Sequence, residues 1–171
     1  MSEMPVAGVV WQVLHYLEGL RRLGHDVTYI EDTGSWPYDP ELDTISDDAA
    51  PAAAWLGRIL GGAGFAGRWA LISAAHPDTF WGMTVERIAE VVERADVLIN
   101  LSGHTILKET HLQVPSNLFS FFASSLSSAT VREAATARVR SSTRTLTPIC
   151  RIAFTSFELP GVHHWMAQAY F

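Results

Sequence analysis

The chain has 171 residues, of which 48% are hydrophobic and 18% are charged, and its formal net charge is −6. This composition is typical of a globular domain with a sizeable core and excludes an intrinsically disordered chain. It contains neither a run of 18 apolar residues nor a basic segment followed by an apolar one at its start, so we predict no membrane span and no secretory signal. The single cysteine, Cys150, rules out an internal disulfide and favours a cytoplasmic location.

The charge is unevenly distributed along the chain. Residues 1–111 carry 16 of the 18 acidic residues and 7 of the 12 basic ones, whereas residues 112–171 have a net charge of +3. A strongly acidic first part argues against nucleic acid as a partner, because phosphate backbones are bound by basic surfaces.

The first element in chain order is a helix over residues 9–23. Its apolar residues recur at helical spacing, which predicts that Val13, Leu17 and Leu20 lie on one buried face. Gly24 ends this helix, because glycine adopts a left-handed cap without steric cost. The β-formers that follow predict a strand over residues 27–31.

The middle of the chain alternates loops with short periodic segments. Residues 32–50 are predicted as a loop, and residues 51–60 as a helix with Pro51 in its first turn, where no hydrogen-bond donor is lost. Residues 61–67 form a turn. Residues 68–73 are compatible with a second strand or with a helix.

A second helix–strand pair follows a loop at residues 76–82. Thr84 is predicted to cap a helix over residues 85–95, and residues 97–101 form a buried strand. Helices and strands therefore alternate, which predicts a parallel sheet with helices on its faces.

Ligands of open parallel sheets bind beyond the carboxyl ends of the strands. One such end carries Glu31 and Asp32, which suit either a ligand-binding carboxylate or a solvated strand end. The other carries Asn100 and the turn Ser102-Gly103-His104, whose small residues suit either ligand approach or a plain turn.

The segment Gly62-Ala-Gly64-Phe-Ala-Gly67 matches the G-x-G-x-x-G pattern of dinucleotide-binding loops. That function requires a strand before the glycines and a helix after them. Here a helix precedes and a candidate strand follows, so the pattern favours a helix-to-strand turn, with dinucleotide binding as the alternative.

Seven histidines raise the question of a metal site. His163 and His164 are adjacent, so in a helix they would point to different faces. His104 and His111 lack a third ligand at ordinary spacing. We predict no metal and no cofactor.

The segment from Leu20 to Asp32, Leu-Arg-Arg-Leu-Gly-His-Asp-Val-Thr-Tyr-Ile-Glu-Asp, resembles the first helix and second strand of GT-B glycosyltransferases. It is more similar to a bacterial group of GT-B-like proteins that carry a Trp-x-x-Leu-x-Tyr-x-x-Gly-Leu segment, then Gly-His-Asp-Val, then Glu-Asp-Thr-Gly. Here these motifs span residues 11–20, 24–27 and 31–34, and the strand at residues 95–103 is similar as well.

The resemblance covers residues 5–115 and implies an α/β fold, a partial Rossmann-like three-layer domain whose parallel sheet lacks its first strand. It implies the acceptor-side domain of an enzyme that transfers a sugar from a nucleotide-sugar donor to an acceptor. No catalytic residue is carried over. The residues expected to face the substrate cleft are Gly8, Trp11, Asp32, Asn100, Ser102, Gly103 and His104.

Residues 116–171 resemble nothing in that family. Serine, threonine, alanine and arginine dominate this tail, and aspartate does not occur in it. Either a shifted reading frame or a divergent C-terminal segment accounts for this composition. We expect the tail to be poorly packed, or docked only through residues 118–122, and the missing first strand to leave an open edge in the sheet.

Three functions remain open from the sequence. The first is a glycosyltransferase fragment that is inactive without its donor domain. The second is a dinucleotide-binding Rossmann protein that uses Gly62 to Gly67. The third is a small interaction protein without catalytic activity.

Overall fold

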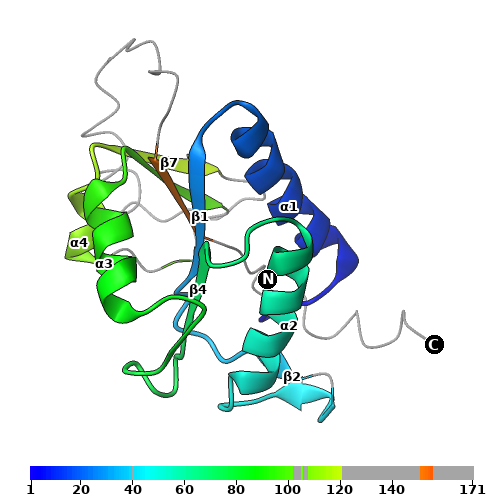
Figure 1. Cartoon of the computed structure of the whole chain (residues 1–171). Helices are drawn as coiled ribbons and strands as arrows, with labels where there is room; N and C mark the ends of the chain where they lie inside the picture. The colour runs from blue at the N-terminus through cyan, green and yellow to red at the C-terminus, as the bar shows by residue number, and fades with distance from the viewer. Residues whose placement is uncertain (40, 102–104, 106–107, 121–150, 156–171) are drawn as a thin grey trace, which may run out of the picture.

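The computed structural model describes residues 1–39, 41–101, 105, 108–120 and 151–155. They form a three-layer α/β domain around a six-stranded sheet (Figure 1). The strands lie in the spatial order β5 (Phe80–Trp81), β4 (Trp69–Ile72), β1 (Asp26–Glu31), β8 (Arg151–Thr155), β6 (Val97–Leu101) and β7 (Ser116–Ser120). All neighbouring strands pair in parallel except β4 and β5. The predicted fold class is therefore confirmed.

Helices cover both faces of the sheet. Helices α1 (Ala7–Arg22) and α2 (Ala50–Gly62) lie on one face, and α3 (Val85–Arg94) and the short α4 (Glu109–Leu112) lie on the other (Figure 1). Val13 and Leu17 of α1 are fully buried, as predicted, and Leu20 packs partly buried against the same core. Ile88 and Val92 of α3 pack against Leu98 in the second core.

The main departure from expectation is strand β8, which lies between β1 and β6 at the centre of the sheet. Val27 and Val97 both pair with Ile152, and Ala153 is completely buried. This is the position that a first Rossmann strand occupies in the order 3-2-1-4-5. The expectation of an open edge there is wrong, and so is docking of the tail through residues 118–122 alone, because a tail strand fills the gap.

Two glycines end their helices in the same way. The N–H of His25 donates to the carbonyl of Leu20, and Gly24 between them has φ +89°. This is the Schellman motif, whose left-handed residue is glycine because only glycine adopts that conformation without strain. Phe65 donates to the carbonyl of Leu60 across Gly64, whose φ is +87°.

Other details of the loops also differ from the sequence prediction. The loop over residues 32–50 contains a two-stranded hairpin of β2 (Tyr38–Asp39) and β3 (Thr44–Ile45). Thr84 caps α3 as predicted, because its hydroxyl accepts from the Arg87 N–H at 3.3 Å. The first residues of the chain form no strand but are buried, with Met1 fully inaccessible.

Candidate functional site

The carboxyl ends of β1, β8 and β6 lie level with one another. Thr155 at the end of β8 pairs with Ile30 on one side and with Asn100 on the other. Asp32 follows Ile30 by two residues. Parallel pairing through β8 therefore brings the two predicted carboxyl-end segments to one edge, although β1 and β6 are not direct neighbours.

Asp32 belongs to a cluster with Lys108 and His111, which we call the carboxyl-edge cluster. The Lys108 ammonium lies 2.5 Å from a carboxylate oxygen of Asp32, whose side chain is 12% exposed. The backbone N–H of Lys108 donates to Nδ1 of His111 at 3.2 Å. Lys108, which directly precedes α4, thus pairs with Asp32, and the imidazole of His111 on α4 interacts electrostatically with the same carboxylate.

The pKa of His111 lies below its usual value. Burial disfavours the charged imidazolium most, and the charge of Lys108 acts in the same direction, while the Asp32 carboxylate opposes both. His111 is therefore neutral at pH 7. Because Nδ1 accepts the Lys108 N–H, the ring proton belongs on Nε2, so His111 is a hydrogen-bond donor there.

Asn100 is the second buried polar group at this edge. Its side-chain amide donates to the carbonyl of Thr105 at 3.1 Å. Within the described part of the chain, neither Oδ1 of Asn100 nor Oγ1 of Thr105 has a hydrogen-bond partner, and both atoms are buried. Buried polar atoms are costly when unsatisfied, so these two are candidates for contact with a polar ligand.

Glu31 has a structural role that the sequence did not reveal. Its buried carboxylate accepts hydrogen bonds from the Ser2 N–H (2.8 Å), the Ser2 hydroxyl (2.6 Å) and the Tyr29 hydroxyl (2.8 Å), and pairs with the N-terminal ammonium at 3.0 Å. Burial alone would raise its pKa, but the ammonium and these donors together lower it. Glu31 is neither a solvated strand end nor available to a ligand.

Two other predicted site residues, Gly8 and Trp11, come from a different layer of the fold than the carboxyl-edge cluster. Gly8 and Trp11 lie on α1, in the helical layer across the sheet from α4 (Figure 1). Trp11 is 59% exposed, and its ring contacts that of His15 with centroids 5.7 Å apart. Ser102, Gly103 and His104 lie outside the described residues.

Lys108, His111 and Thr105 were missed by sequence reasoning as site residues. His111 had been considered only as a metal ligand with His104. The described residues contain no group of three or more His, Cys, Asp or Glu side chains that could hold a metal ion. The feature that could have indicated these residues is their position, because they follow the carboxyl end of the strand at residues 97–101 in a polar segment.

The glycine pattern at residues 62–67 is a helix end. Gly64 is the left-handed residue after α2, and β4 begins at Trp69. Phe65 of the turn is buried in the core with Leu56 and Leu60. The turn therefore presents no helix N-terminus to a pyrophosphate.

Comparison with protein-family models, with curated proteins and with solved structures gives no match to this chain. In the part of the chain that the structure describes, no helix has the length and apolar character needed to cross a bilayer.

Proposed function

We propose that this chain is the acceptor-side domain of a GT-B-type glycosyltransferase and binds a hydroxyl-rich acceptor at the carboxyl edge of its sheet. The observation that carries the proposal is the group formed by Asp32, Lys108 and His111, at the same edge of the sheet as Asn100. The strand order supports the proposal, because it is Rossmann-like and puts this group where ligands of such sheets bind.

The chemistry of the group suits sugar hydroxyls, which both donate and accept hydrogen bonds. The Asp32 carboxylate and Oδ1 of Asn100 are acceptors, and the Lys108 ammonium and Nε2 of neutral His111 are donors. A hydroxyl group that donates to Oδ1 of Asn100 would also satisfy a buried acceptor that otherwise costs about 1–3 kcal/mol.

By the same resemblance, the nucleotide sugar binds to a second Rossmann-like domain, with transfer in the cleft between the two. The chain alone is then expected to bind the acceptor weakly and the nucleotide not at all. The proposal assigns binding roles only, because His111 is held as a donor and no described group is arranged as a base toward an acceptor hydroxyl.

Saturation-transfer NMR with a panel of free mono- and disaccharides tests the proposal. We expect at least one saccharide to bind, with Asp32→Asn weakening binding by about tenfold, the loss of one charge-assisted hydrogen bond. Asp47→Asn is the matched control, because it removes the same charge from an exposed loop. Binding of no saccharide, or equal weakening by both variants, would overturn the proposal.

Calorimetry with UDP, GDP and NAD separates the other functions. Micromolar NAD binding that is lost in Gly64→Val would favour a dinucleotide-binding protein. The position of Gly64 in a helix cap gives no support to that alternative.

A further inference from the structure

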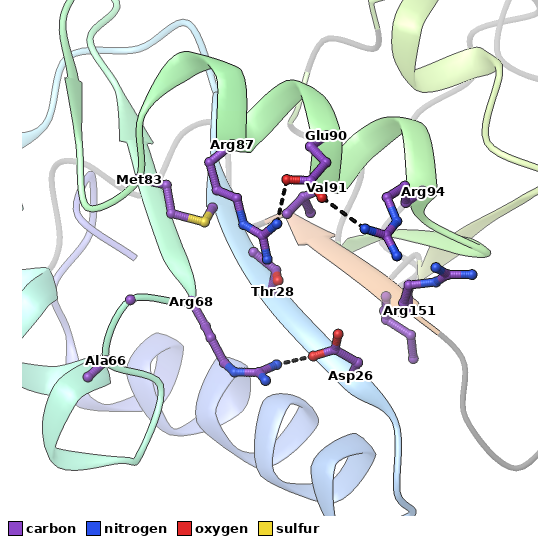
Figure 2. Close-up of a pocket in the computed structure, with 12 residues that line it drawn as sticks. Asp26, Thr28, Ala66, Arg68, Met83, Arg87, Glu90, Val91, Arg94 and Arg151 are labelled. Carbon is purple, nitrogen blue, oxygen red and sulfur yellow. Dashed lines mark hydrogen bonds and ion pairs between the residues drawn. The ribbon is translucent and has the colours of Figure 1, made fainter.

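A separate pocket of about 430 Å³ lies at the opposite, amino edge of the sheet, on the α3 face (Figure 2). It opens where β1 and β8 begin and where the turn after α2 leads into β4. Its lining residues come from β1, the turn before β4, α3 with the preceding Met83, and β8. Its volume falls within the range of about 300–1,000 Å³ that is usual for small-molecule sites.

Four arginines line this pocket: Arg87 and Arg94 of α3, Arg68 of the turn before β4, and Arg151 at the start of β8. Two lining residues, Asp26 and Glu90, are acidic, and Arg151 pairs with Asp96 beside the pocket. Four guanidinium charges therefore face three carboxylates, which leaves the site positive in a chain whose net charge is −6. The arginine side chains are between 47% and 58% exposed, so N–H groups of each guanidinium are accessible to solvent.

Carboxylates hold these arginines in place. Glu90 accepts from Arg87 at 2.5 Å and from Arg94 at 2.9 Å, as Figure 2 shows. Asp26 pairs with Arg68 at the other side of the opening. Each ion pair orients a guanidinium before a ligand arrives, which lowers the entropy lost on binding.

Three lining residues, Met83, Val91 and Ile152, add a smaller apolar surface to the pocket, next to Thr28. Met83 and Ile152 are 8% and 5% exposed, and Val91 lies between the α3 arginines. The pocket therefore combines a cationic rim with a smaller apolar surface. A ligand that fits both has an anionic group at one end and a carbon skeleton at the other.

We propose that this pocket binds a small organic phosphate ester. Arginine forks match the geometry of phosphate oxygens in bidentate hydrogen bonds, and several arginines around one site favour a dianion over a single carboxylate. The phosphate group contacts the arginine rim, and the organic group lies against Met83, Val91 and Ile152.

This inference is independent of the proposed acceptor site. The pocket contains Asp26 and Thr28 from the start of β1, whereas Asp32 of the carboxyl-edge cluster follows the end of that strand. The Asp32→Asn substitution, which is expected to weaken saccharide binding, leaves this pocket intact. Failure of one proposal therefore does not decide the other.

Isothermal titration of the full chain with phenyl phosphate, inorganic phosphate and benzoate tests the inference. Phenyl phosphate is expected to bind with a dissociation constant below about 1 mM, and inorganic phosphate and benzoate about tenfold more weakly. Equal affinity for phenyl phosphate and inorganic phosphate would contradict a role for the apolar surface. The titration is repeated by NMR. If phenyl phosphate up to about 10 mM gives neither heat in the calorimeter nor chemical-shift changes in the NMR spectrum, the proposal is overturned.

Variants then locate the binding. Arg94→Gln is expected to weaken phenyl phosphate binding about tenfold, which is the loss of one charge-assisted contact. The control is Arg22→Gln, which removes a more exposed arginine (77% against 58% for Arg94) that pairs with Glu18 on α1. If Arg94→Gln does not fold, Arg94→Lys keeps the charge but removes the fork, and weakening of about threefold is expected. Equal effects of the Arg94 and Arg22 variants would overturn the proposal.

Discussion

Asp96 and Arg151 are joined by two reciprocal contacts across 55 residues of sequence. The Asp96 N–H donates to the Arg151 carbonyl at 2.9 Å, and the Arg151 N–H donates to the Asp96 carboxylate at 2.9 Å. Nε of Arg151 lies 3.4 Å from the same carboxylate. The turn before β6 therefore fixes the first residue of β8 and sets the register of the central strand.

Asp96→Ala should loosen β8 without unfolding the domain. The substitution removes the acceptor of the Arg151 N–H, and we expect a loss of about 1 kcal/mol in the free energy of unfolding. Amide hydrogen exchange of residues 151–155 should accelerate more than that of α1. Asp47→Ala, which removes a carboxylate from an exposed loop, serves as the control. If the amides of residues 151–155 exchange at the same rate in the wild type, in Asp96→Ala and in the control variant, Asp96 does not set the register of β8.

Ala153→Glu should abolish folding, because Ala153 is completely inaccessible and packs with Ile30 and Leu98 at the centre of the sheet. An unpaired charge at such a site costs several kcal/mol, a large fraction of the stability of a domain. Ala54→Glu makes the same change on the exposed side of α2 and should leave the circular dichroism spectrum unchanged. Normal folding of Ala153→Glu would show that β8 is dispensable to the sheet.

Glu31→Gln should destabilise the protein by about 3–5 kcal/mol, because it leaves a buried ammonium without its counter-charge. Tyr29→Phe removes one donor to the same carboxylate and should cost about 1.5–3 kcal/mol. The folded pKa of Glu31 lies below the ordinary 4.5, so its contribution is present above pH 4.5 and is lost as the pH falls. Urea denaturation between pH 7 and pH 3 measures both effects, and an equal acid-induced loss in wild type and Glu31→Gln would contradict the assignment.

His111 should lower the free energy of unfolding on acidification over a higher pH range than Glu31 does. Its folded pKa lies below 6.5, so the unfolded chain binds the proton more readily, and stability is lost as the pH falls below 6.5. One proton contributes at most about 1.4 kcal/mol per pH unit. His111→Gln should flatten the dependence between pH 7 and pH 5. His15→Gln, on the exposed side of α1, should leave it unchanged.

The local elements could be predicted because each one carries its own signal. Helical spacing in residues 9–23 and 85–95, the β-formers at 27–31 and 97–101, and the cap at Thr84 all agree with the structure. Gly24 and the glycine-rich turn that contains Gly64 indicated where α1 and α2 end. The acidic residue after β1 and Asn100 in β6 were also assigned correctly to one edge, because parallel strands align their ends.

Contacts between distant segments could not be predicted in the same way. The local sequence around Lys108 and His111 does not indicate that they lie near Asp32. Their proximity to the end of β1 results from the packing of α4 on the sheet. The role of Glu31 depends on Ser2, which lies 29 residues away. The arginine pocket combines residues from Asp26 to Ile152, so no local pattern reveals it.

The sequence by itself determined the helices near residues 9–23, 51–60 and 85–95, the strands at 27–31 and 97–101 and the parallel sense of these two strands, because these depend on spacing and capping within a few residues. It did not indicate the short strands Tyr38–Asp39, Thr44–Ile45 and Phe80–Trp81, which lie in predicted loops. Only the tertiary structure decided which strand occupies the centre. Residues 151–155 are a short apolar run without strong punctuation, and their place between β1 and β6 depends on backbone pairing with strands more than 50 and 120 residues away. Such pairing is set by the free energy of completing the sheet and burying Ala153, which no local segment encodes.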